Sequence, residues 1–388
     1  MSARLRARST ARADGLDKVR ALQRVLYRSA KQQPNRRFHA LFDKVARGDI
    51  LFRAWDEVRS NRGAPGVDGV TIERVEASGV ASFLQELAAA LKAGTYRPAP
   101  LRRVHIPKPG QPGKTRPLGI PCVRDRVAMT AAKLVLEPVL EADFLPVSFG
   151  FRPKRSAHQA LEAIRVEANR GAEWVLDADV RDCFGSIDHD ALVAQLARRV
   201  SDRRMLKLLR GWLRVGVLED GVTTVTGAGT PQGSPISPLL ANVALHVLDQ
   251  AWAQGGRSLG VLVRYCDDFV ILCRTRQRAE QARRLVAEIL ATLGLHLHPD
   301  KTRIVGLTKG RQGFDFLGFH HHKVESWRWR GRYYLHRWPS DRAMRQVRAK
   351  VREATSRREV GRAVENGLHC GMFERVRPEP AELGGRTG

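Results

Sequence analysis

The sequence predicts a protein of the α+β class, in which strands and long helices follow one another in mixed order. The chain has 388 residues, of which 43% are hydrophobic, so it can bury at least one large core and form two or three domain-sized units. Short apolar runs bounded by Gly and Pro alternate with longer amphipathic segments, and no internal repeat is visible. Together these observations favour the α+β class.

The N-terminal part combines a basic segment with helices and one short hairpin. Residues 1–40 hold eleven Lys and Arg against two Asp, which is typical of either a solvated basic arm or an RNA-contacting extension. Residues 41–91 have a mostly helical pattern, interrupted by a loop with Gly and Pro at 61–71. Two short strands are then expected at 104–107 and 117–121.

The rest of the chain alternates between helices and strands. Amphipathic spacing predicts helices over residues 124–144, 156–169, 188–213, 276–293 and 341–364, and residues 231–252 are expected to begin with a turn and become a helix. Strands are expected over 173–180, on both sides of 265–268, and over 295–305, 314–319 and 333–336. Gly294 follows a helix as a C-cap does, and the final segment, 365–388, has no sustained period.

The charge of the chain indicates a polyanionic partner. Lys and Arg number 67 against 40 Asp and Glu, which gives a net charge of +27 and a pI of about 11.0. No apolar run approaches the roughly 18 residues of a membrane span, and no apolar stretch follows the basic start. The five cysteines are widely spaced without a CxxC pair, which argues against a disulfide framework or a zinc ribbon. We therefore expect a soluble, cytoplasmic protein that binds nucleic acid and not a membrane.

The most specific feature is the tetrapeptide Tyr265-Cys266-Asp267-Asp268, which lies between two strongly apolar segments. Two adjacent carboxylates on a hydrophobic hairpin repel each other. A bound divalent cation removes that cost, because hard oxygen ligands suit Mg²⁺. A simple polar β-turn is the alternative interpretation, since Asp is common in turns.

A further acidic residue, Asp179, ends the buried strand predicted at 173–180. An Asp in that place is either a metal ligand or a strand-end turn residue. It precedes Asp267 by 88 residues with a helix pair between them, which allows the two strands to be neighbours in one sheet. Three converging carboxylates would hold two Mg²⁺ ions for phosphoryl transfer.

Two other segments suit phosphate or nucleotide binding. The loop at 229–235, rich in Gly, Pro and Ser, leads into a helix and permits close approach to a nucleic acid or nucleotide. The basic hairpin carries Lys108, Lys114 and Arg116, which either neutralise a triphosphate or form a solvated basic loop.

Taken together, these segments resemble the reverse transcriptases encoded by bacterial group II introns, a family with maturase function. The resemblance runs from about residue 54 to residue 350 and is carried by NRGAPGVDG, YRPAPLRRVHIPK, GKTRPLGIPCVRDRVAMTAAKLVLEPVLEADF, SFGFRPKRSAHQAL, WVLDADVRDCFGSIDHDAL, GTPQGSPISPLLANVALHVLD, RYCDDFVIL, GLHLHPDKT and FDFLGF. It implies a right-hand polymerase. The implied division is a basic N-terminal extension at 1–53, fingers at 54–172, a palm at 173–322, and a partial thumb with a divergent tail at 323–388. The palm would be an antiparallel sheet backed by helices.

The resemblance also implies a catalytic centre of three aspartates. Asp179 and Asp267 would be the main metal ligands, with the Val180 carbonyl assisting, and Asp268 would have a weaker role. The cofactor would be Mg²⁺, as two ions, with Mn²⁺ as an alternative. Phe184 would lie under the incoming sugar and exclude a ribose 2′-hydroxyl.

Other matching positions would bind the substrate and the primer. Lys108 and Arg116 would grip the triphosphate, and Lys301 would lie near the leaving pyrophosphate. Gln232 and Gly233 would lie beside the nucleotide and the template. The primer end would be held by Phe316, Leu317 and Gly318.

The implied function is an RNA-directed DNA polymerase that extends a primer 3′-hydroxyl with dNTPs on an RNA template. Intron RNA and target DNA are implied as further partners. An RNA-directed RNA polymerase is disfavoured, because the bulk of Phe184 opposes ribonucleotides. The oligomeric state does not follow from the sequence.

Two departures from the family pattern keep alternatives open. Gly185 stands where the family usually has Asp, and the thumb that begins before residue 350 is short, which puts processivity and splicing assistance in doubt. The alternatives are a catalytically weak RNA-binding maturase or truncated remnant, and a domesticated reverse transcriptase in host or phage defence. The run from His320 to His322 favours surface or RNA contact over metal binding, because adjacent strand residues point to opposite faces.

Overall fold

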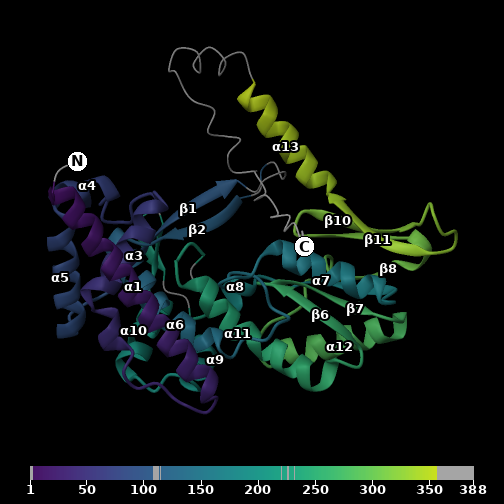
Figure 1. Cartoon of the computed structure of the whole chain (residues 1–388), viewed down its shortest axis with the longest axis horizontal. Coiled ribbons are helices and arrows are strands. Elements are labelled where there is room, and N and C mark those ends of the chain that lie inside the picture. Colours follow the sequence, from purple (N-terminus) through teal and green to yellow (C-terminus); the bar gives the residue numbers. More distant parts are fainter. Residues whose placement is uncertain are drawn as a thin grey trace, which may run out of the picture.

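The computed structural model, shown in Figure 1, places a helix-rich half beside a sheet-rich half. It describes residues 3–107, 113, 115–219, 221–224, 227–230 and 232–355. The N-terminal helices form the first half, and the C-terminal strands form the second, from which the last helix projects. One buried cluster runs from Trp55 in the first half to Leu176 and Ile271 in the second, so the two halves share a hydrophobic core.

A 30-residue helix, α1 (Ala3–Gln32), crosses the outer surface of the helix-rich half and packs on α3 (Gly48–Ser60) and α6 (Val123–Glu141). Its buried apolar stripe consists of Val19, Leu26 and Ala30. Lys31 Nζ donates a hydrogen bond to the carbonyl of Ala142 at 2.9 Å, just beyond the end of α6. Residues 18–32 are therefore a packed helix and not a solvated arm. The apolar stripe is narrow among many basic residues, which hid it in the sequence.

Helix α6 is buried along most of its length, and three further helices accompany it in the N-terminal part of the chain. They are α2 (Phe42–Val45), α4 (Ile72–Ser78) and α5 (Val80–Ala93). The predicted loop at 61–71 is confirmed and separates α3 from α4. It ends where Thr71 Oγ1 accepts the backbone N–H of Arg74 and caps α4.

The predicted basic hairpin is also confirmed. It consists of β1 (Leu101–Pro107) and β2 (Thr115–Ile120), which pair antiparallel. Two short strands, β4 (Val217–Glu219) and β5 (Val222–Thr224), extend it into a sheet of order β2-β1-β4-β5. Lys108 and Lys114 lie outside the described residues.

A four-stranded antiparallel sheet forms the centre of the sheet-rich half. Its order is β6-β7-β3-β8, from β3 (Trp174–Asp179), β6 (Gly260–Tyr265), β7 (Asp268–Cys273) and β8 (Arg303–Gly306). The strands that carry the predicted aspartates, β3 and β7, are direct neighbours, as the sequence predicted.

Both faces of this central sheet are covered, because side chains alternate along each strand. Leu176 and Ile271 face the main core, which includes residues of α11 (Ser237–Ala251) and α12 (Arg276–Ala291). Val175 and its neighbours face a second cluster, built with α7 (Ala157–Asn169) and a smaller sheet. A sheet held on both faces has little freedom to move its strand ends.

The smaller sheet has the order β11-β10-β9, from β9 (Gly313–Phe316), β10 (Phe319–Glu325) and β11 (Tyr333–Pro339). The hairpin of β10 and β11 ends in a tip that is turned away from the helix-rich half (Figure 1). Helix α13 (Asp341–Ala354) projects from its other end, capped by Ser340. The predicted alternation of the histidines is confirmed, since His321 is buried and His320 and His322 lie on the other face. The segment 356–388 lies outside the described residues.

Three predicted elements differ in detail. The helix expected over 188–213 is two helices, α9 (His189–Ala197) and α10 (Arg203–Leu213), because Asp202 caps the second one. The strand expected over 295–305 is shorter: Leu297 makes only an isolated bridge to Val180 before β8. The strand expected over 314–319 is the end of β9, a turn at 317–318 and the start of β10. The turn and helix expected over 231–252 are confirmed, with α11 beginning at Ser237 and continuing into a π-helical turn, η1 (Trp252–Gly256).

The proposed domain boundaries cut through two elements. Residue 53 lies inside α3 and residue 322 inside β10, whereas residue 173 directly precedes β3. The division into four segments stays a prediction. Among the described helices, none is both long enough and apolar enough to cross a membrane.

Candidate active site

The predicted acidic residues lie at one end of the central sheet, where β3 ends and β7 begins. Asp179 and Asp268 are directly opposite each other in the β3–β7 register, and Tyr265 is opposite Asp268 across the β6–β7 hairpin. Asp267 occupies the turn of that hairpin. Opposite residues in an antiparallel pair have Cβ atoms about 4.5–5.5 Å apart. The three carboxylates therefore share one end of the sheet.

A cleft of about 1180 Å³ lies against this end of the sheet and is large enough for a nucleotide. Six predicted positions line it: Arg116, Asp179, Asp268, Lys301, Phe316 and Leu317. The wall also includes Asp177, Asp300, Arg303, Asp315 and, from α13, Arg342. The cleft thus lies between the basic hairpin, the central sheet, the small sheet and the start of the last helix.

Two carboxyl groups on the acidic side of the cleft, those of Asp268 and Asp177, have a raised pKa. Exclusion of water, followed by the charges of neighbouring carboxylates and first of all Asp267, raises the pKa of Asp268 to about 6. Burial also raises the pKa of Asp177, although Arg303 Nε donates to its Oδ2 at 3.1 Å. A bound cation stabilises the charged form of carboxyls that are crowded in this way.

Lys301 pairs with Asp179, the aspartate at the end of β3. Its Nζ lies 2.5 Å from Asp179 Oδ2. The backbone places it there, because His298 N donates to the carbonyl of Asp179 at 2.8 Å and Thr302 N donates to the carbonyl of His298 at 3.0 Å. The turn that carries Lys301 is therefore tied to the residue that its side chain contacts.

A buried network supports the turn between β6 and β7. Arg264, which is fully buried, pairs with Asp249 through Nη2 and Oδ2 at 2.5 Å. Its Nη1 donates to the carbonyl of Cys266 at 2.9 Å and to Asn242 Oδ1 at 3.0 Å. Asn242 Nδ2 in turn donates to the carbonyl of Gly150 at 2.8 Å. The network thus fixes the backbone of Cys266, the residue that precedes Asp267.

The same turn is closely packed from the side. Cys266 has a φ of 60°, in the left-handed region that side-chain-bearing residues rarely adopt. A Cβ at Gly150 would lie 2.5 Å from Cys266 N, so only glycine fits there without moving the turn. Backbone strain of this kind persists only where the surroundings fix it.

Phe184 lies in a short helical turn, α8 (Cys183–Ser186), directly after β3 and partly buried against the main core. Thr230 N donates to the carbonyl of Phe184, so α8 is tied to the loop at 229–235. At Gly185 the carboxylate of Asp182 occupies the space that a side chain would need. A side chain at position 185 would therefore require the carboxylate of Asp182 to move.

The loop at 229–235 reaches the basic hairpin. Gly119 N, in β2, donates to the carbonyl of Gln232 at 2.8 Å. Gly233 has a φ of 108°, and a Cβ there would lie 2.7 Å from the carbonyl oxygen of Gly119. This close approach of two backbones explains why the loop requires glycine at this position.

Some predicted positions do not line the cleft. Among the described residues these are Val180, Phe184, Gln232, Gly233, Asp267 and Gly318. They lie on the segments that carry its wall: Val180 and Phe184 follow Asp179, Asp267 precedes Asp268, and Gly318 follows Leu317. Lys108 lies outside the described residues.

The donor chemistry of the aspartates fits a hard divalent cation. Within the ranges that the structure describes, no three His, Cys, Asp or Glu side chains are arranged so that they could hold a metal ion. Burial, followed by the charges of Asp267 and Asp179, raises the pKa of Asp268, so these carboxyl groups lie close enough to influence one another. Carboxylate oxygens are the ligands that Mg²⁺ prefers, and water supplies its remaining positions.

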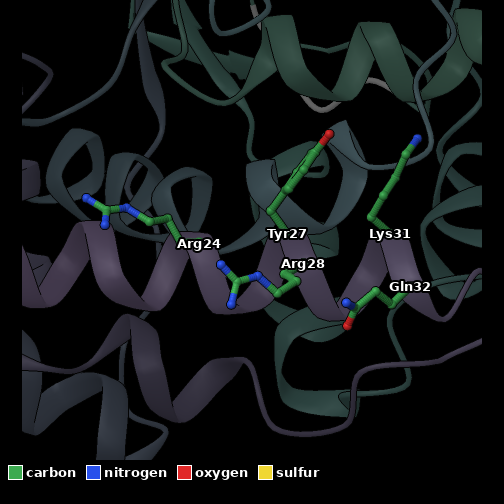
Figure 2. Close-up of a pocket in the computed structure, with 5 residues that line it drawn as sticks. All are labelled: Arg24, Tyr27, Arg28, Lys31 and Gln32. Carbon is green, nitrogen blue, oxygen red and sulfur yellow. The ribbon is translucent and has the colours of Figure 1, made fainter.

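A second hollow, of about 440 Å³, lies on α1 and is lined by side chains of that helix alone (Figure 2). They are Arg24, Tyr27, Arg28, Lys31 and Gln32. Figure 2 shows the side chains of Arg24 and Arg28 extending from the helix without enclosing a space. The hollow is therefore part of a basic surface and not an enclosed ligand site.

Sequence reasoning missed several residues that shape the site. Asp177 is two residues before Asp179 on the same strand, and a period of two places both on one face. That signal was available. The partners of Arg264 could not be predicted from the sequence, because Asp249 and Asn242 lie on α11 and only the fold brings them to β6.

Comparison with known proteins agrees with this geometry. Residues 106–321, more than half of the chain, match the family described as "Reverse transcriptase (RNA-dependent DNA polymerase)". The chain therefore belongs to the reverse transcriptase family, a class of RNA-directed DNA polymerases, and the predicted right-hand fold is confirmed.

Individual relatives refine the class. Protein YkfC of Escherichia coli (strain K12) is 35% identical over 338 residues, which cover 77% of this chain and 87% of that protein. The group II intron-encoded protein LtrA of Lactococcus lactis subsp. cremoris is 39% identical over 215 residues, which cover 55% of this chain but only 35% of LtrA. A chain of the structure entitled "Partial Cas6-RT-Cas1--Cas2 complex" aligns with a TM-score of 0.42 at 26% identity, over 65% of this chain and 41% of that one. This chain is thus a reverse transcriptase that is similar, over 215 residues, to a group II intron-encoded protein.

Proposed function

We propose that this chain extends the 3′-hydroxyl of a primer with dNTPs on an RNA template, at the cleft beside the central sheet. The observation that carries the proposal is the meeting of Asp179, Asp267 and Asp268 at one sheet end, with Arg116 and Lys301 on the same cleft. Acidic and basic groups thereby line one cleft of nucleotide size. This arrangement suits a reaction that gathers a hydroxyl, a triphosphate and a cation.

Asp179 and Asp267 are the proposed cation ligands, with the Val180 carbonyl and Asp268 assisting. Two bound Mg²⁺ ions, or Mn²⁺ in their place, would lower the pKa of the primer hydroxyl and neutralise the triphosphate. Burial, followed by the charges of the neighbouring carboxylates, raises the pKa of Asp268 and so disfavours an empty, fully ionised centre. The three carboxylates therefore favour a bound cation over a simple turn.

The basic side chains act on the phosphates. Arg116 projects from β2 into the cleft, where its guanidinium can bind phosphate oxygens of the incoming nucleotide. Lys301, beside Asp179, is placed to neutralise or protonate the leaving pyrophosphate. Lys108, on the same hairpin, is proposed to assist Arg116.

The remaining predicted residues position the nucleotide and the primer. Phe184 is proposed to select deoxyribose by its bulk, with Gln232 and Gly233 beside the nucleotide and template. The primer end is proposed to rest on the turn between β9 and β10, which consists of Leu317 and Gly318 next to Phe316. Leu317 and Gly318 have φ values of 50° and 81°, so this turn is tight and defined.

The nucleic-acid partners of this proposal are the RNA template and the primer. Intron RNA and target DNA are proposed as additional partners because the chain resembles group II intron proteins and has a net charge of +27. The exposed basic side chains of α1 and α13 are the proposed contact surfaces.

Primer extension on an RNA template with Mg²⁺ and dNTPs tests this function. We expect extension by the natural chain and its loss in Asp267→Ala. The matched control is Asp190→Ala, which removes an exposed aspartate of α9 whose partner, Arg210, is 3.4 Å away. Full extension by Asp267→Ala would contradict the assignment. Absence of extension by the natural chain, with RNA still bound, would favour a maturase or remnant.

A further inference from the structure

The tip of the β10–β11 hairpin exposes two tryptophans that the catalytic site does not use. Trp327 is 86% exposed and Trp329 is 57% exposed, the largest side-chain rings on the described surface to be so open. Burial of an indole is worth several kcal/mol in a core, so a pair left in water indicates a binding surface. We propose that this tip, residues 326–332, binds single-stranded nucleic acid by stacking bases on the two indoles.

The positive charge of the tip indicates that its partner is a nucleic acid. The tip carries Arg328, Arg330 and Arg332 between and beside the tryptophans. Its nearest acidic neighbour in sequence, Glu325, accepts a hydrogen bond from Gly331 N at 2.6 Å, so that carboxylate is engaged within the loop. Exposed rings interleaved with cations bind unpaired strands, because every base has a face to stack and every nucleotide has a phosphate.

The guanidinium groups are already arranged around the rings. Arg328 Cζ lies 5.8 Å from the centroid of the Trp327 ring and 5.9 Å from that of Trp329. Arg332 Cζ also lies 5.9 Å from the centroid of the Trp329 ring. These are cation–π distances, so the cations stay close to the rings on which a base would stack.

The loop is held in shape by its own hydrogen bonds. Ser326 is buried; its Oγ accepts from Arg328 N at 3.3 Å and from Trp329 N at 3.2 Å. Ser326 N donates to the carbonyl of Arg332 at 2.7 Å, which closes the loop at its base. A preorganised loop loses less conformational entropy when it binds, which favours a binding role over a random exposed turn.

The site lies apart from the catalytic cleft. The hairpin register places Phe319 opposite Pro339 at the cleft end and Glu325 opposite Tyr333 at the tip end. A seven-residue strand spans about 20 Å, so the tip would contact a strand several nucleotides away from the reacting end. Figure 1 shows the tip beyond the central sheet, on the side away from the helix-rich half. This inference rests on the proposed function only in that the partner is nucleic acid.

The test compares the full chain with Trp327→Ala/Trp329→Ala, without dNTPs. The probe is a labelled single strand of about twelve nucleotides, as RNA and as DNA, beside a blunt duplex of the same sequence. We expect the double alanine variant to lose about tenfold or more in affinity for the single strand, and less for the duplex. The RNA and DNA arms show which strand is preferred.

Two controls make the result specific. Trp327→Phe/Trp329→Phe keeps a stacking ring at both positions and should stay within about threefold of the natural chain. Phe52→Ala removes a ring that is 43% exposed on α3 and should leave the affinity unchanged. Equal affinity of the natural and double alanine chains would overturn the proposal, as would an equal loss for duplex and single strand. Failure of primer extension would contradict the proposed function without changing this comparison.

Discussion

The central sheet and the small sheet are both antiparallel, but they differ in how many of their faces are packed against the core. The sheet β6-β7-β3-β8 is covered on both faces, and its functional groups project only from one end. The sheet β11-β10-β9 is packed on one face, through Phe314 and Leu335, and leaves rings and histidines on the other. Packing on both faces of the central sheet fixes the positions of a few carboxylates. The exposed face of the small sheet instead provides a broad surface for a polyanion.

The strongest test of the covered sheet is its buried ion pair. Arg264→Leu leaves the buried carboxylate of Asp249 without its guanidinium partner, with only His246 Nδ1 at 3.6 Å, and also removes the hydrogen bond to the carbonyl of Cys266. We expect a loss of about 3–5 kcal/mol in the free energy of unfolding, measured by denaturant titration. The matched control is Arg276→Leu, which breaks an exposed i,i+4 pair with Glu280 and should cost less than about 1 kcal/mol. Equal effects of both changes would contradict the role assigned to burial.

The small sheet should be sensitive to acid on its packed face. His321 is fully buried and stacks on Phe314 with ring centroids 4.9 Å apart. Burial, followed by the charge of Arg337, lowers its pKa from 6.5 to about 4. The unfolded chain therefore takes up the proton first, and stability present above pH 6.5 is lost as the pH falls toward 4.

The expected loss from His321 is about 3 kcal/mol once the pH reaches the folded pKa. The measurement is the free energy of unfolding of the natural chain and of His321→Leu between pH 7 and 4, with the difference between them plotted against pH. The leucine variant should lack this part of the pH dependence. Parallel curves for the two chains would show that His321 does not titrate as described.

These expectations show how far sequence alone reaches. The apolar runs around 265–268 were enough to predict the hairpin of β6 and β7, and the strand of Asp179 was correctly expected beside it. Local pattern could not show that Asp249 and Asn242 meet Arg264, because long-range packing of α11 on the sheet decides it. It also missed α1, whose narrow apolar stripe is diluted by basic residues. The aspartates could be predicted because they interrupt an apolar pattern, whereas their supports are part of the core.

The selection of deoxyribose over ribose tests the proposed role of Phe184, which lies between the main core and the candidate active site. Phe184→Ala should raise incorporation of rNTPs relative to dNTPs by about tenfold or more, because the bulk that opposes a 2′-hydroxyl is removed. Phe184→Tyr keeps that bulk and should retain selectivity. Single-nucleotide incorporation with matched rNTP and dNTP measures the ratio. An unchanged ratio in the alanine variant would refute the proposed role of Phe184.

The smallest effect is expected on the exposed surface of α1. Arg24→Gln/Arg28→Gln removes two charges from the basic surface in Figure 2. RNA affinity should fall modestly, and the slope of log K against log salt should decrease by roughly one for each lost phosphate contact. The matched control, Arg283→Gln/Arg284→Gln, removes two exposed charges from α12. Identical salt slopes for both variants would show that α1 is not a preferred contact.

The central claim is that the carboxylates at the end of the covered sheet perform the chemistry and that other surfaces hold the nucleic acid. Asp179→Ala separates the two, because it removes the partner of Lys301 and a proposed cation ligand without changing the exposed surfaces. We would measure RNA affinity and primer extension on the same preparation, with Mg²⁺ and dNTPs present for extension. The account predicts that extension is abolished while RNA affinity stays within a few-fold of the natural chain. Full extension by Asp179→Ala, or loss of RNA binding in parallel with activity, would contradict it.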